Sequence, residues 1–232
     1  MTARQIQTSC TADGGVSHHD SSADTPAHGP IVVGSQRTQI LSDPAESAAA
    51  FRRARSLVLP DLFDAALLAS LLDSCRRSDF VDECVRGLGT REIERPQRVG
   101  GAISLMLSRA PFLRWVEAAT GCGPLDRAEG RVVQTRANGS DGLDWHDDLD
   151  NGNRLLGITI SLLDAPVEGG WFELRKKGTE EPLARHLHRQ PGTAMLFAVG
   201  PALEHRLLPI GSGGPRRVYS GWLFRAAPAG AA

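Results

Sequence analysis

The fold of this chain is decided by the stretch Leu143-Asp144-Trp145-His146-Asp147-Asp148, which stands just ahead of an apolar run. His146 and Asp148 are two residues apart, and on an extended backbone residues with this spacing point to the same face. One imidazole and one carboxylate could therefore contact a single metal ion. Taken alone, this H-x-D pattern arises often by chance and also fits a polar turn, so its weight depends on the rest of the sequence.

Downstream of Arg131 the chain consists of short β-rich runs separated by clusters of Gly, Asn, Asp and Pro. This texture is typical of an antiparallel sandwich or barrel. The strands that we expect are residues 131–135, 154–163, 171–175, 193–199 and 216–225.

The region upstream of these runs is mainly helical in its pattern. Residues 56–59 have the composition of a short strand, and a helix is then expected over residues 60–77, with Asp61 as its N-cap. A second helical region covers residues 101–120 and is interrupted at Pro111. We therefore expect an α+β protein in which flanking helices precede a jelly roll, the double-stranded β-helix.

The domain organisation that we expect is a disordered tail over residues 1–45, followed by one catalytic domain over residues 46–228. The first 30 or so residues are rich in Ser, Thr, Ala, Asp, Gly and Pro and carry almost no large apolar side chains. They cannot bury enough surface to offset the entropy of ordering. Three histidines of this segment, His18, His19 and His28, are accordingly expected to be solvated.

The composition disfavours several classes of protein. The net charge is −1 and the arginines are spread along the chain, which argues against a dedicated nucleic-acid binder. No apolar run approaches the ~20 residues of a membrane span, and no apolar segment follows a basic start. The four cysteines show no C-x-x-C spacing, which indicates free thiols. We expect a cytoplasmic protein without a nucleic-acid or membrane partner.

His205 is the candidate for a third metal ligand. It lies 59 residues after His146 and follows the apolar run Thr193-Ala194-Met195-Leu196-Phe197. Two neutral imidazoles and one carboxylate on one face of an octahedron are the arrangement of non-haem Fe(II) oxygenases. The three remaining positions suit a bidentate α-keto acid and O₂.

A candidate anion-binding residue follows His205. In the run Gly214-Pro215-Arg216 and beyond, Arg216 shares a strand parity with Ser220 and Trp222, so these side chains would face one interior. A guanidinium binds a buried carboxylate through two hydrogen bonds. The parity favours Arg216 over its neighbour Arg217, and a surface arginine remains the alternative.

Together these motifs resemble the 2-oxoglutarate and Fe(II)-dependent oxygenase superfamily, most closely its prolyl 4-hydroxylase-like branch. The resemblance covers about residues 50–226. It is carried by four elements in order: Gly142 to Asp148, Gly169-Gly170, Glu204-His205-Arg206 with Pro209, and Gly214-Pro215-Arg216 through Trp222. Gly169-Gly170 is interpreted as a structural bulge.

The resemblance implies a double-stranded β-helix open at one end onto iron. It makes His146, Asp148 and His205 the iron ligands and catalytic residues, Arg216 the partner of the C5 carboxylate of 2-oxoglutarate, and Ser161 a hydroxyl near that carboxylate. It also implies Fe(II), 2-oxoglutarate as co-substrate, O₂, and ascorbate as a candidate reductant. The implied reaction is hydroxylation, because related halogenases lack a carboxylate at the position of Asp148 and this chain has one. Succinate and CO₂ would be released.

One position departs from the family pattern. About ten residues before the first ligand, related enzymes often have a Tyr that helps to hold the co-substrate, whereas this chain has Thr135-Arg136. The primary substrate stays open between a peptide or amino acid and a small metabolite. His186-Leu187-His188 is an alternative metal pair, and it keeps a non-catalytic or differently reactive cupin-like jelly roll as the second interpretation.

Overall fold

The computed structural model describes residues 29–85, 88–149 and 153–227. Its helices are α1 (Pro44–Ala54), α2 (Ala65–Arg76), α3 (Arg98–Leu107) and α4 (Ala110–Thr120). Its strands are β1 (Ile31–Val33), β2 (Thr38–Ile40), β3 (Ser56–Leu59), β4 (Asp79–Val85), β5 (Gly89–Arg95), β6 (Leu125–Thr135), β7 (Leu143–His146), β8 (Arg154–Ser161), β9 (Val167–Gly169), β10 (Phe172–Lys176), β11 (Ala184–His186), β12 (Ala194–Ala198), β13 (Leu203–Leu207), β14 (Ile210–Gly213) and β15 (Arg216–Arg225). Within the described ranges, no helix is long and apolar enough to cross a membrane.

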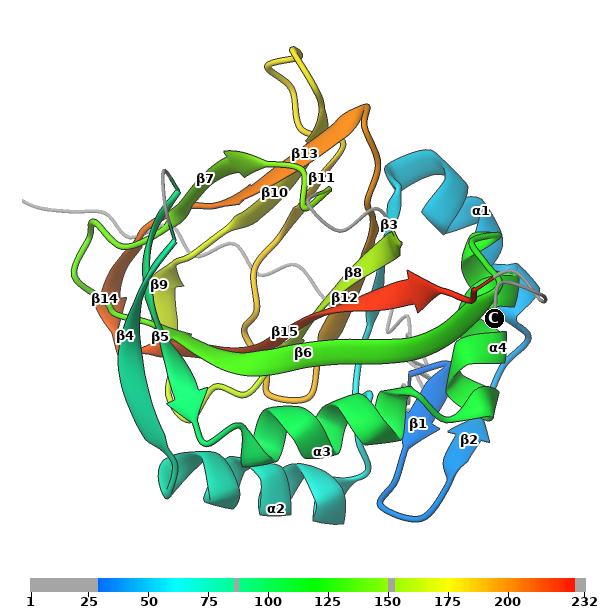
Figure 1. Cartoon of the computed structure of the whole chain (residues 1–232), viewed down its shortest axis with the longest axis horizontal. Coiled ribbons are helices and arrows are strands. Elements are labelled where there is room, and N and C mark those ends of the chain that lie inside the picture. Colours follow the sequence, from blue (N-terminus) through cyan, green and yellow to red (C-terminus); the bar gives the residue numbers. More distant parts are fainter. Residues whose placement is uncertain (1–28, 86–87, 150–152, 228–232) are drawn as a thin grey trace, which may run out of the picture.

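Two antiparallel sheets form the body of the protein (Figure 1). The major sheet has the order β3-β12-β8-β15-β6-β5-β4, and the minor sheet has the order β11-β10-β13-β7. From β7 onward the longer strands alternate between the two sheets, with β8, β12 and β15 in the major sheet and β7, β10 and β13 in the minor one. This winding is that of the expected jelly roll, so the predicted fold class is confirmed.

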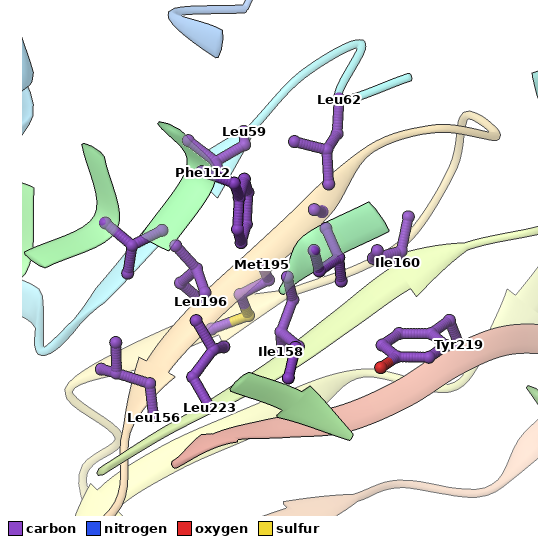
Figure 2. Close-up of a cluster of buried hydrophobic side chains, with 14 of the residues drawn as sticks. Leu59, Leu62, Phe112, Leu156, Ile158, Ile160, Met195, Leu196, Tyr219 and Leu223 are labelled. Atoms are coloured by element: carbon purple, nitrogen blue, oxygen red, sulfur yellow. The ribbon is translucent and has the colours of Figure 1, made fainter. Parts of the chain in front are cut away.

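The four helices cover the outer face of the major sheet and its end (Figure 1). The main apolar core fills the space between the helices and the major sheet. Figure 2 shows part of this core, including Phe112 of α4, Ile158 of β8 and Leu223 of β15. Because side chains alternate along a strand, the residues between these core positions point to the inner face, toward the minor sheet. The inner face is therefore the one available for a site.

The strands expected from residue 131 onward are confirmed as β6, β8, β10, β12 and β15, and the strand over residues 56–59 as β3. β6 begins six residues earlier than expected, and the shorter strands β7, β9, β11, β13 and β14 were not predicted. The first predicted helix begins later than expected. Its N-cap is Asp64, whose carboxylate accepts from the backbone N–H of Leu67 at 2.7 Å, whereas Asp61 has a left-handed φ of 47°. The second helical region is two helices, and Pro111 lies in the first turn of α4, where its missing N–H costs nothing.

The predicted tail over residues 1–45 is wrong for its last part. Residues 1–28 lie outside the described residues, but residues 29–45 contain the β1–β2 hairpin and the start of α1. Ile31 and Val33 are fully buried in the main core, and this apolar alternation is what orders the segment. The domain thus starts before residue 46.

Candidate functional site

The three predicted ligands meet at the mouth of the jelly roll, between the two sheets. His146 ends β7 and lies directly opposite His205 of the neighbouring β13, with ring centroids 4.2 Å apart. One ligand atom each from His146, Asp148 and His205 all lie within 4.8 Å of one another, and no other such group of three occurs among the described residues. The geometry therefore offers two imidazoles and one carboxylate to a single metal ion.

The orientation of His146 is fixed by its own backbone. Its Nδ1 lies 2.7 Å from the carbonyl oxygen of Asp144, to which a protonated Nδ1 donates a hydrogen bond. That tautomer leaves Nε2 with a free lone pair, and Nε2 is the nitrogen that faces Asp148, at 3.7 Å from Oδ1. Burial, followed by the neighbouring His205, lowers the pKa of His146, which keeps the ring neutral as a metal ligand must be.

Asp148 reaches the site in a different way from the one expected. The strand ends at His146, and Asp148 lies in the following loop with a left-handed φ of 59°. The sequence correctly predicted that Asp148 lies close to His146, but the reason given, alternation along one strand, was wrong. A turn brings the carboxylate back toward the histidines. A non-glycine residue in this conformation is uncommon and is often found at functional sites.

Two residues whose role the sequence did not reveal hold Asp148 in place. The indole Nε1 of Trp222 donates a 2.7 Å hydrogen bond to Asp148 Oδ2, and Arg154 donates a 3.0 Å hydrogen bond to the Asp148 carbonyl. The guanidinium of Arg154 also lies over the Trp222 ring, 3.8 Å from its centroid. Burial alone would raise the pKa of Asp148, but His205 and Trp222 outweigh it and hold the pKa well below its usual range. The carboxylate is therefore ionised.

A cavity of about 450 Å³ contains these groups and extends along the inner face of the major sheet. Arg216, Val218, Ser220 and Trp222 of β15 all line it, as the predicted parity requires. Arg216 is 3 % exposed and has no ion pair or hydrogen bond to another side chain in the described part of the chain. Burial lowers its pKa to about 10, so the guanidinium stays charged at neutral pH. A buried charge without a partner is costly unless a ligand supplies the counter-charge.

Arg217 points the other way. It pairs with Asp164 and donates a 2.9 Å hydrogen bond to the Gln134 side chain. It does not line the cavity. The choice of Arg216 over Arg217 as the residue that faces the interior therefore agrees with the geometry.

Three further residues surround Arg216. Thr135 lies directly opposite it on β6, is buried and lines the cavity, so this threonine stands on the wall where the expected Tyr is missing. Ser161 is fully buried beside Val218, two residues along β15, and its Oγ has no hydrogen-bond partner. Gly170 has a φ of +71°, and a Cβ there would meet Arg216 Cδ at 3.1 Å. Gly170 therefore lies against the aliphatic part of the Arg216 side chain, and the irregular register at this strand pair lies in β14, between Ile210 and Ser212.

The two histidines of the alternative metal pair, His186 and His188, contact each other. His186 Nε2 is 3.2 Å from His188 Nδ1, and His188 Nε2 is 3.0 Å from Thr159 Oγ1. Burial, with Arg216 as the next cause, lowers the pKa of His186 to about 4 and that of His188 well below its usual range. The structure brings no carboxylate or third ring to this pair within the described ranges. Neither histidine lines the cavity, and the pair lies behind Thr159, which does.

Comparison with known proteins agrees with this geometry. Residues 132–224 match the family model described as the 2OG-Fe(II) oxygenase superfamily, and that range contains His146, Asp148, His205 and Arg216. No curated protein matches the sequence.

Solved structures with the same fold include three enzymes of the following kinds. A prolyl-4-hydroxylase from Pseudomonas putida has a TM-score of 0.60 at 16% identity, with coverage of 79% of this chain and 100% of that one. SnoN, an α-ketoglutarate-dependent epimerase of nogalamycin biosynthesis, has a TM-score of 0.59 at 18% identity, covering 82% and 85%. A prolyl hydroxylase from Trichoplax adhaerens has a TM-score of 0.58 at 14% identity, with coverage of 78% of this chain and 90% of that one. At these identities the likeness shows the fold alone. Over residues 132–224 the chain therefore resembles the 2OG-Fe(II) oxygenase superfamily, and it shares its fold with solved enzymes of that kind.

Proposed function

We propose that the chain hydroxylates an organic substrate at a site in which His146, Asp148 and His205 bind Fe(II) and Arg216 binds the C5 carboxylate of 2-oxoglutarate. The observation that carries this proposal is the pairing of two features in one cavity: three potential ligands within 4.8 Å of one another, and a buried guanidinium with no acidic partner among the described residues.

The residues around Arg216 fit the co-substrate. Four buried side-chain polar atoms in the described residues lack a hydrogen-bond partner, and two of them are Arg216 Nε and Ser161 Oγ. Buried polar groups are nearly always hydrogen-bonded, so unpaired donors of this kind point to an acceptor supplied from outside. A carboxylate accepts from both. Ser161 is accordingly proposed as a second co-substrate residue.

The roles of the protein groups follow from their surroundings. Bound together, Fe(II), 2-oxoglutarate and O₂ supply the oxidising power to hydroxylate a C–H bond, with release of succinate and CO₂. The bond from His146 Nδ1 to Asp144 directs Nε2 to the metal, and Trp222 fixes the carboxylate of Asp148. Arg216 anchors the co-substrate by its tail, which orients its other end toward the ligands.

Anaerobic spectroscopy tests the proposal. Adding 2-oxoglutarate to Fe(II)-loaded protein without oxygen should produce the weak visible charge-transfer band of the chelate, at one iron per chain. In air, with ascorbate as reductant, the same sample should release succinate slowly even without a primary substrate. A folded, iron-loaded sample that gives neither signal would favour the cupin-like interpretation, in which the metal does not bind an α-keto acid.

We also propose a cytoplasmic location, and one catalytic domain that includes the β1–β2 hairpin as well as residues 46–228. Three cysteines in the described residues, Cys75, Cys84 and Cys122, are free thiols, which is typical of a reducing compartment.

A further inference from the structure

A second group of arginines lines the cavity away from Arg216. Arg91 of β5, Arg131 of β6 and Arg154 of β8 all contribute to its wall. Arg131 lies opposite Ser220, four residues along β15 from Arg216, which at about 3.3 Å per residue is roughly 13 Å. That separation is too large for one small dianion to bridge once its other end is on the metal. An anion that binds this group is therefore a different molecule from the co-substrate.

The three arginines carry more positive charge than their neighbours balance. Arg91 and Arg131 share one carboxylate, with Arg91 Nε 2.6 Å from Glu83 Oε2 and Arg131 Nη1 2.8 Å from Glu83 Oε1. Arg154 lies 3.8 Å from Asp148 Oδ1, but this carboxylate is assigned to the metal.

The other charges of the cavity cancel. Fe(II) and Arg216 together balance Asp148 and the dianionic co-substrate. Each remaining charged side chain of the wall has a partner of opposite charge: Lys177 pairs with Asp147, Glu204 with Arg175, and Arg206 with Glu173, which also pairs with Arg185 outside the cavity. Three guanidiniums then face one carboxylate, Glu83, so an anionic group entering the cavity meets an uncompensated positive field.

Two observations suggest that this field serves a ligand. The Nε of Arg154 is buried and has no hydrogen-bond partner in the described residues. Arg131, Arg154 and Trp222 also line a second hollow of about 640 Å³, so these side chains border both hollows. A molecule longer than 2-oxoglutarate has room to lie across Trp222 with one end near the metal.

We propose that the primary substrate is an organic anion whose carboxylate or phosphate binds among Arg91, Arg131 and Arg154, so that a neighbouring C–H bond faces the metal. This inference rests on the proposed function, because it assigns the substrate of that same site. Arg154, held over Trp222 and next to Asp148, places the anion close to the reacting centre.

Calorimetric titration of small anions into the anaerobic Fe(II) and 2-oxoglutarate complex, at constant ionic strength, tests the proposal. Inorganic phosphate and benzoate are the two probes, and the tighter one distinguishes a phosphate from a carboxylate substrate. One site per chain is expected, weakened about ten- to a hundredfold in Arg154→Met, since one charged hydrogen-bond partner is lost. Arg136→Met is the matched control, because Arg136 pairs with Glu92 and lines neither hollow.

Glu83→Gln separates ligand binding from a structural role. If Arg91 and Arg131 serve a substrate, removing the carboxylate they share should tighten probe binding severalfold. If they serve only to pair with Glu83, the variant should lose stability and gain no affinity. The proposal is overturned if the wild type shows no saturable binding of either probe. It is also overturned if the affinity for the probe is unchanged in both Arg154→Met and Glu83→Gln.

The charge-transfer band serves as the internal reference. Loss of the band on adding the probe would show that the anion displaces 2-oxoglutarate at Arg216, which also overturns the proposal. Absence of the band before any probe is added would instead be a failure of the proposed function.

Discussion

Trp222 Nε1 donates a 2.7 Å hydrogen bond to Oδ2 of Asp148, although the two residues are 74 positions apart in the chain. The same strand, β15, carries Arg216 on the same face. One rigid element therefore positions both the carboxylate proposed to bind the metal and the guanidinium proposed to bind the co-substrate. This coupling makes Trp222 a positioning residue whose effect should appear in metal binding.

Trp222→Phe should weaken Fe(II) binding about ten- to a hundredfold, the usual cost of losing a hydrogen bond to a metal ligand. The phenyl ring still offers a face to Arg154, so packing is largely retained. Competition with a chromophoric chelator would measure the affinity. Trp171→Phe is the matched control, because Trp171 also stacks under an arginine, Arg185, yet does not line the cavity. Equal iron affinity in the two variants would show that the indole hydrogen bond has no such role.

Arg216→Ala should weaken 2-oxoglutarate binding by about two to four decades, since breaking a buried charge pair costs about 3 to 5 kcal/mol. Arg217→Ala removes a partly exposed pair with Asp164 and should change co-substrate affinity little. Iron content should survive in both variants, whereas His205→Ala should lower it. Titration of 2-oxoglutarate with parallel iron analysis provides the measurement. Small, similar effects of the two arginine substitutions would contradict the assigned pocket.

Short spacing patterns made much of this site predictable. The three ligand candidates and Arg216 stand in motifs whose order is specific, and the alternation along residues 216–222 correctly indicated which arginine faces inward. The role of Trp222 was not predictable, because its hydrogen bond to Asp148 depends on how β15 and the loop after β7 meet in space. The group formed by Arg91, Arg131 and Arg154 was not predictable for the same reason, since these residues come from three separate strands that meet only in the fold.

The elements that were missed are those whose order comes from tertiary contacts. The β4–β5 hairpin is rich in charged residues and looks solvent-exposed in sequence, but it pairs with β6 and buries Ile93. α1 did carry a local signal, since Asp43 caps it and Pro44 occupies its first turn. Its single buried residue, Phe51, left the apolar pattern too weak to detect.

Gly170→Ala should reduce 2-oxoglutarate affinity more than iron affinity. The new methyl group would lie 3.1 Å from Arg216 Cδ and 3.0 Å from Ile210 Cγ1, and the φ of +71° adds backbone strain of about 1 to 2 kcal/mol. Gly178→Ala is the matched control, because its φ of +77° gives the same strain while nothing lies within 4 Å of the added atom. If both substitutions lower stability equally and leave co-substrate affinity intact, Gly170 does not support Arg216.

His186 should make the protein sensitive to mild acid. Burial and the nearby Arg216 lower its pKa from 6.5 to about 4 in the folded state. Between these values the unfolded chain binds more protons than the folded one, so the free energy of unfolding should decrease as the pH falls from 6.5 toward 4. The buried His188 adds to the loss in the same direction. His186→Gln removes one of the two groups while keeping an amide that can reach His188. Denaturant unfolding across this range should show the stability of the variant improving relative to the wild type as the pH decreases. A constant difference between the two proteins from pH 7 to 4 would mean that His186 is not held neutral by its site.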